Sequence, residues 1–226
     1  MEDKFEKIKK IVEKELKDCP GHNFDHVVRV YNMAVHLAKG EDVDLEVIKI
    51  AALLHDIGGK KETDDPTGKT DHAIESAKMS KPILKKLGFS AEKINHICDC
   101  IISHRYKTEN QPKTLEAKIL FDADKLDAAG AIGLARGFVW IGKNKAHIYR
   151  KVEDINDYVK ENLEGGKING RIKDKTKHSP QIEFETKIKH LPDRIYTRKG
   201  KKVMKERVEY SKKYLDRLEK EIKGEI

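Results

Sequence analysis

The chain has 226 residues, of which 38% are charged and 38% hydrophobic, and its formal net charge is +8. This length and hydrophobic fraction favour a sizeable buried core over a disordered chain. No apolar run approaches the roughly 20 residues that a membrane span requires, and the start, MEDKFEKIKKIVEKEL, lacks the apolar segment of a secretory signal. We therefore expect a cytoplasmic protein without membrane contact, and the positive charge favours anionic partners.

Apolar residues recur at helical spacing along nearly the whole chain. The pattern predicts helices over 24–38, 44–57, 70–87, 90–104 and 113–127, and a long basic helix with an apolar stripe over 204–222. Gly88 is expected to end one helix and Ser90 to cap the next. Pro82 is expected to kink or restart the helix that contains it. The polar segments 58–70 and 163–180 are expected to be loops. No strand alternation persists, so the predicted class is all-α.

Two regions are expected along the chain. Residues 1–142 are predicted to form a helical core that carries the functional residues. Residues 143–226 are predicted to be a loop-rich segment with a C-terminal helix that packs on this core. The apolar stripe over 204–222 either packs on its own domain or forms a homodimer contact, and the sequence leaves both readings open.

The dipeptide His55-Asp56 ends an apolar helix and is followed closely by Gly58-Gly59. Two polar side chains therefore emerge where a buried helix meets a polar segment. Burying an imidazole and a carboxylate costs free energy unless each has a partner, and a shared divalent cation would satisfy both. The alternative is a carboxylate bonded to the backbone at the helix end, beside a partly exposed His55.

Further candidate ligands lie on two other predicted helices. His26 lies on the inward side of the helix over 24–38. Asp122, Asp124 and Asp127 interrupt an otherwise apolar helix, and Asp124 and Asp127, one turn apart, share a face. Two imidazoles and at least two carboxylates suit Mn, Fe, Co, Ni, Zn or Mg rather than a structural thiolate zinc site. We expect one divalent metal ion.

The order H…HD…D resembles the HD-domain superfamily of metal-dependent phosphohydrolases. The resemblance is carried by GHNFDHVVRV (21–30), AALLHDIGGK (51–60), DHAIESA (71–77), ISHRY (102–106) and FDADKLDAAGAIGLAR (121–136). Residues 197–221 are similar to the C-terminal helix of one bacterial and archaeal subgroup. The resemblance implies an HD-domain helical bundle with an additional long C-terminal helix. It also implies metal ligands at His26, His55, Asp56 and Asp124, with Asp122 as the second choice to Asp124.

The resemblance implies cleavage of phosphoester or phosphoanhydride bonds in nucleotides, and the subgroup is similar to nucleoside triphosphate pyrophosphohydrolases. The expected partner is therefore a small anionic substrate, a nucleotide. One alternative is a nucleoside monophosphatase or phosphodiesterase that uses the same site. Two others are a non-enzymatic nucleotide sensor and a basic helical module that binds nucleic acid. The last is disfavoured because aromatic residues make up only 6% of the chain and no stacking platform is recognisable.

Other residues near the expected ligands have the chemistry to act on a phosphate. Phosphoryl transfer needs positive charge around the equatorial oxygens, and the nearest cations in the sequence are Arg29, Lys60 and Lys125. His72 and His104 are candidates for proton transfer or phosphate contact.

The surroundings of the expected site suggest three further assignments. His22 is a weaker candidate to line the same pocket. Asp127 is expected to orient a ligand or a cation. Relatives with two metals often carry paired histidines, but here Arg105 follows His104, which disfavours a second metal.

Overall fold

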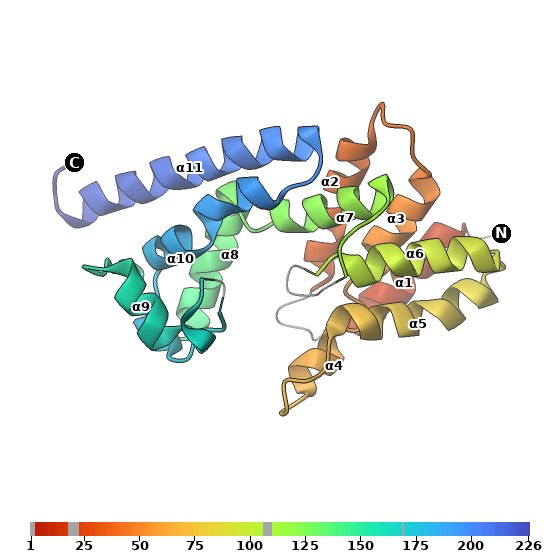
Figure 1. Cartoon of the computed structure of the whole chain (residues 1–226), viewed down its shortest axis with the longest axis horizontal. Helices are drawn as coiled ribbons and strands as arrows, with labels where there is room; N and C mark the ends of the chain where they lie inside the picture. The colour runs from red at the N-terminus through yellow and green to blue at the C-terminus, as the bar shows by residue number, and fades with distance from the viewer. Residues whose placement is uncertain (1–2, 18–22, 106–109, 169) are drawn as a thin grey trace. The chain divides into compact units, whose positions relative to one another are not determined.

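The structure, a computed structural model, describes residues 3–17, 23–105, 110–168 and 170–226 as helices joined by turns and loops (Figure 1). The α-helices are α1 (Lys4–Leu16), α2 (Phe24–Ala38), α3 (Leu45–Leu54), α4 (Gly59–Asp64), α5 (His72–Lys86), α6 (Ala91–Ser103), α7 (Leu115–Leu126), α8 (Gly130–Lys143), α9 (Ile155–Asn162), α10 (Pro180–Thr186) and α11 (Arg198–Ile222). Three short 3-10 helices are η1 (Glu164–Gly166), η2 (Lys175–Lys177) and η3 (Ile188–Arg194). The described residues contain no β-strand, only one isolated bridge between Leu163 and Ile172. The predicted all-α class is confirmed.

The chain divides into two compact units, residues 1–124 and residues 125–226. The boundary falls inside α7, ahead of residue 142, where the sequence suggests the end of the core. The physical reason lies in the packing of α8, which contacts α10 and α11 and so belongs with the C-terminal residues.

The first unit is organised around α3, which packs against α1, α2, α5 and α6. Nearly every side chain of α3 is buried, from Val47 to Leu54. Burial of these side chains is the main stabilising contribution, at about 1.5–3 kcal/mol for each valine, isoleucine and leucine. The central helix is therefore held rigidly, and its C-terminal end is a fixed platform for the residues that follow.

Side-chain caps set where the helices of this unit begin. The Asn23 side chain accepts a hydrogen bond from the backbone N–H of His26, and the Asp71 side chain accepts from the N–H groups of Ala73 and Ile74. Each cap satisfies a backbone donor that the helix itself leaves without a partner. Helices α2 and α5 therefore begin where these side chains place them.

The predicted junction between α5 and α6 is confirmed. Gly88 adopts φ +74° just after α5, in the left-handed region that favours glycine. The Ser90 side chain then caps α6 by accepting from the N–H of Lys93. The expected restart at Pro82 is wrong, because α5 runs without interruption from His72 to Lys86.

The segment 58–70 is not wholly a loop, because Gly59–Asp64 forms the short helix α4. Its length of six residues and its polar side chains leave no apolar stripe to recognise, so sequence periodicity misses it. Helix α4 contacts α5. This contact brings the polar residues that follow the His55-Asp56 pair against a second helix.

In the second unit, α11 packs against α8, α10 and η3. Met204 and Leu215 of its apolar stripe are buried, whereas Ile222 near its end is 49% exposed. Arg207 of α11 donates to the carbonyl oxygen of Leu126 at 2.5 Å, and the Gly130 N–H donates to Ser211 Oγ at 2.9 Å. Helix α11 is thereby bonded to the end of α7 and the start of α8. No described helix is long and apolar enough to cross a membrane.

Candidate metal centre

A tight turn between α3 and α4 presents His55 and Asp56. The N–H of Ile57 donates to the carbonyl of Leu54, and the N–H of Gly59 donates to the carbonyl of Asp56. At Gly58 the turn lies directly against α5: its N–H donates to Ser76 Oγ at 2.9 Å, and an added Cβ would lie 2.6 Å from the Ser76 backbone nitrogen. Only glycine fits this approach, which explains why a residue without a side chain stands two positions after Asp56.

Four of the predicted ligands converge in the first unit. The Nε2 atoms of His26 and His55 lie 3.4 Å apart, and Asp56 Oδ2 lies 3.5 Å from the first and 3.4 Å from the second. Asp124 Oδ1 lies 3.3 Å from His26 Nε2. The four side chains come from α2, from the turn after α3 and from α7. They are buried, apart from the Asp124 side chain, which is 15% exposed.

Two further histidines lie on the other side of Asp56. Its Oδ1 atom lies 3.4 Å from His72 Nε2 and 3.5 Å from His104 Nε2, and these two nitrogens are 3.1 Å apart. His72 begins α5 and His104 follows α6. The two oxygens of one carboxylate thus face two different pairs of imidazoles.

The tautomers of three histidines follow from their outer partners. His55 Nδ1 lies 2.8 Å from the carbonyl oxygen of Ala52, and His104 Nδ1 lies 2.5 Å from that of Ile101. His72 Nδ1 lies 2.5 Å from a Glu62 carboxylate oxygen. Carbonyl and carboxylate oxygens accept hydrogen bonds, so each Nδ1 carries a proton and Nε2 is the ring nitrogen that faces the cluster.

This arrangement fits a divalent cation. Two ligand atoms that are each about 2.1 Å from one ion stand about 3.0–4.2 Å apart, depending on the angle at the ion. The four separations given above, 3.3 to 3.5 Å, fall within this range. His26, His55 and Asp124 form one group able to hold an ion, and His55, Asp56 and His104 form another. Histidines that donate their second ring N–H to an oxygen are usual among metal ligands.

Burial favours neutral imidazole at His104. Desolvation lowers the pKa of His104 to about 4, against the opposing influence of Asp56. A neutral ring keeps its lone pair for a cation or for an incoming proton. At neutral pH His104 is therefore an acceptor in this cluster.

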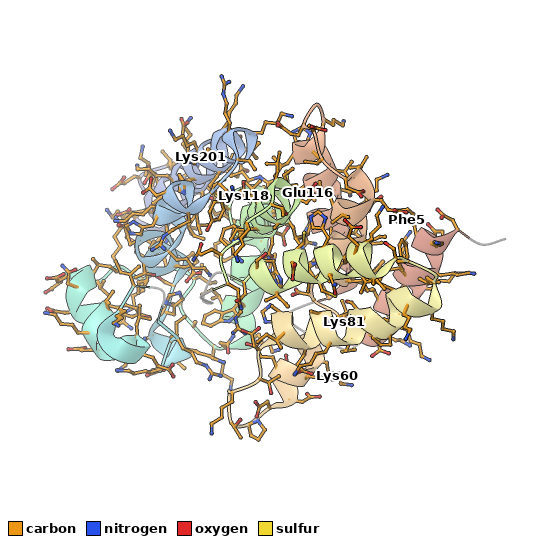
Figure 2. All side chains as sticks on the ribbon, turned by 45° about the vertical axis from the view of Figure 1, so that its right-hand side comes forward. Phe5, Lys60, Lys81, Glu116, Lys118 and Lys201 are labelled. Carbon is orange, nitrogen blue, oxygen red and sulfur yellow. The ribbon has the colours of Figure 1, made fainter. Side chains whose placement is uncertain are left out.

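The three basic residues predicted to contact phosphate differ in their exposure to solvent. Arg29 is half-buried on α2, three residues after His26, and Lys125 is half-buried and directly follows Asp124 in α7. Lys60 is exposed on α4 (Figure 2). His22 lies outside the described residues.

Asp122 on α7 and Asp127, which directly follows this helix, are both buried. Asp122 is buried completely. Asp127 forms an ion pair with Arg136 at 2.6 Å within the second unit. Asp127 therefore orients the side chain of Arg136, and its expected role beside the metal ligands stays a prediction.

The sequence pattern does not identify Glu62, which bonds to His72 and to Arg105. Arg105 Nη2 donates to Glu62 Oε1 at 2.9 Å, and Arg105 Nη1 lies 3.1 Å from Asp71 Oδ2. The segment around Glu62 is polar throughout, so nothing in its pattern separates this residue from solvated neighbours. Only the position of α4 against α5 identifies it.

Comparisons with known proteins agree with this geometry. The profile of the HD-domain family matches residues 23–129. The uncharacterized protein YpgQ of Bacillus subtilis is 27% identical over 222 residues, which cover 97% of this chain and 94% of YpgQ.

Solved structures resemble the whole chain. The crystal structure of YpgQ in complex with ADP matches with a TM-score of 0.69 and 25% identity, covering 96% of this chain and 94% of that one. An HD-superfamily hydrolase from Bacillus thuringiensis matches with a TM-score of 0.68 and 26% identity over 97% of both chains. The predicted family, with its all-α fold and its histidine and aspartate cluster, is confirmed: this chain belongs to the HD-domain family, which includes hydrolases.

Proposed function

We propose that the protein is a divalent-metal-dependent hydrolase of phosphoester or phosphoanhydride bonds that acts on nucleotides. The observation that carries the proposal is that Nε2 of His26 lies 3.3 to 3.5 Å from ligand atoms of His55, Asp56 and Asp124, separations suited to a shared ion. The complex of the related YpgQ protein with ADP supports a nucleotide as the ligand. Within the nucleotides we favour a nucleoside triphosphate and release of pyrophosphate.

The four residues would hold the cation through two Nε2 atoms and two carboxylates. When bound, the cation would polarise a phosphate oxygen and make a water molecule a stronger nucleophile. The rigid α3 platform and the Nδ1 bond of His55 keep the ligands in place before the ion arrives, so little reorganisation is needed.

The other candidate residues would transfer protons or offset the negative charge of the phosphate. His104, neutral and with its Nε2 lone pair turned inward, accepts a proton, and His72 beside it contacts a phosphate oxygen or relays that proton. Arg29 and Lys125 lie beside ligands in the sequence and would offset negative charge on the phosphate. Lys60, which is exposed, would act only on the outer part of a substrate.

The test is a panel of nucleoside tri-, di- and monophosphates assayed with Mn²⁺, Co²⁺, Ni²⁺, Mg²⁺ and Zn²⁺. Release of pyrophosphate from a triphosphate supports the proposal. Release of inorganic phosphate from a monophosphate identifies the alternative activity on the same site. Absence of turnover with every metal and nucleotide would refute the proposed function.

A further inference from the structure

Beside the cluster, one carboxylate joins three helical elements. Glu62 lies on α4, and its Oε2 atom accepts hydrogen bonds from the backbone N–H of His72 at 2.9 Å and from His72 Nδ1 at 2.5 Å. Both donors belong to the residue that begins α5. Two bonds to one side-chain oxygen fix both where His72 lies and how its ring is turned.

Glu62 is itself held in place by Arg105, which follows the C-cap residue of α6. Arg105 Nη1 donates to Glu62 Oε2 at 3.1 Å and Nη2 donates to Oε1 at 2.9 Å, a two-pronged contact. Arg105 also pairs with Asp71, the N-cap residue of α5, at 3.1 Å. Bidentate arginine–carboxylate pairs fix direction as well as distance.

The electrostatics favour the ionised form of Glu62. Burial alone would raise the pKa of Glu62, but the hydrogen bonds from His72 and the charge of Arg105 outweigh this effect and hold the pKa below its ordinary value. An ionised carboxylate has no proton to donate, so it accepts from both His72 donors and from Arg105 together.

We infer that Glu62 is a positioning residue: it holds the His72 ring with Nδ1 protonated and Nε2 directed at Asp56 Oδ1 and the cluster. This inference rests on the proposed function for its effect on turnover, because His72 is the group that would meet the phosphate. In this role Glu62 acts through His72, to which it is bonded directly.

The kinetic test is a double-mutant cycle between Glu62 and His72. Glu62→Ala should lower kcat by about 10–100-fold, the usual effect of losing a residue that orients a ligand in a metal site. Glu62→Gln keeps one acceptor oxygen for the His72 donors but turns an NH2 group towards Arg105, so it should recover part of this loss. In a His72→Ala background, Glu62→Ala should have no further effect, because the residue through which it acts is gone. The matched control is Glu75→Ala, which removes an acid of α5 that pairs with Lys61 and Lys78 and leaves His72 untouched.

Three results would overturn the inference. These are wild-type kcat in Glu62→Ala, no recovery in Glu62→Gln, or the same loss with and without His72. A second readout does not depend on turnover: imidazole ¹⁵N shifts in metal-free protein should report His72 protonated at Nδ1 in the wild type and a mixture of tautomers in Glu62→Ala. If no nucleotide is hydrolysed, the ¹⁵N result still decides the role of Glu62, and an unchanged tautomer would refute it.

Discussion

The Nε2 atom of His26 lies 3.3 Å from Oδ1 of Asp124, although the first residue belongs to α2 and the second to α7. A short contact between a buried imidazole and a carboxylate from distant parts of the chain is held by the packing of the whole first unit. Replacing either residue tests whether the pair binds a metal ion.

We expect Asp124→Ala and His55→Ala to lose metal and activity together. Loss of an outer partner typically costs about 10–100-fold in metal affinity, so loss of a direct ligand should cost at least about 100-fold. Metal affinity by calorimetry and kcat/KM on the best nucleotide measure the two effects. The control is His36→Ala, an exposed histidine on the same helix as His26. Normal metal binding in Asp124→Ala would remove this aspartate from the site.

Metal should stabilise the folded chain. A ligand that binds only the native state adds about 2.7 kcal/mol when its free concentration is 100 times its Kd. Scanning calorimetry should therefore show a Tm that rises with Mn²⁺ or Co²⁺ and returns to its starting value with a chelator. Asp124→Ala should show no such rise, and a rise equal to that of the wild type would indicate binding elsewhere.

The metal-free protein should lose stability as the pH falls from about 6.5 to about 4. The pKa of His104 is lowered to about 4 in the folded state, whereas an unfolded histidine has a pKa of about 6.5. In this window the unfolded state binds more protons, so the free energy of unfolding decreases as the pH falls, by roughly 2–3 kcal/mol over the full range. Urea unfolding at pH 7 and pH 4.5 measures the change. His104→Asn should flatten it, and an equal slope in both proteins would assign the effect to other groups.

Gly58→Ala should destabilise the chain by about 1–3 kcal/mol, because the new methyl group would meet the backbone of Ser76 at 2.6 Å. The turn that carries His55 and Asp56 would have to move, so metal affinity should fall as well. Gly137→Ala is the matched control: nothing lies within 4 Å of an added Cβ on α8, and alanine in a helix should stabilise by about 0.5–1 kcal/mol. Urea unfolding compares the two, and equal stabilities would contradict the packing argument.

The half-buried cations should matter more than the exposed one. Arg29→Ala and Lys125→Ala should each lower kcat/KM by about 10-fold or more, since both would offset charge that develops on the phosphate. Lys60→Ala should have a smaller effect. Lys81→Ala, on the exposed side of α5 (Figure 2), serves as the control for general loss of positive charge. The reverse order, with Lys60 dominant, would place the substrate over α4.

The fold class and the helices around the site were predictable because apolar periodicity and capping residues are local signals. Ser90 and Gly88, for example, mark their junction in the sequence alone. The position of Glu62 was not predictable, because a short polar helix has no periodic signature and its role arises from contacts with α5 and α6. The C-terminal boundary of the first unit was not predictable either, because it depends on the packing of α8 against α10 and α11, which are distant in the sequence.

Helix α7 continues from the first unit into the second, with Asp124 as the last residue of one and Lys125 as the first of the other. The ends of helices fray when their last turn has nothing to follow it. A fragment cut at this boundary would leave the proposed ligand Asp124 on a fraying helix end, so its affinity for the ion should fall even with every proposed ligand still present. A fragment extended to residue 142 would keep α7 whole and shield Asp124 from that loss.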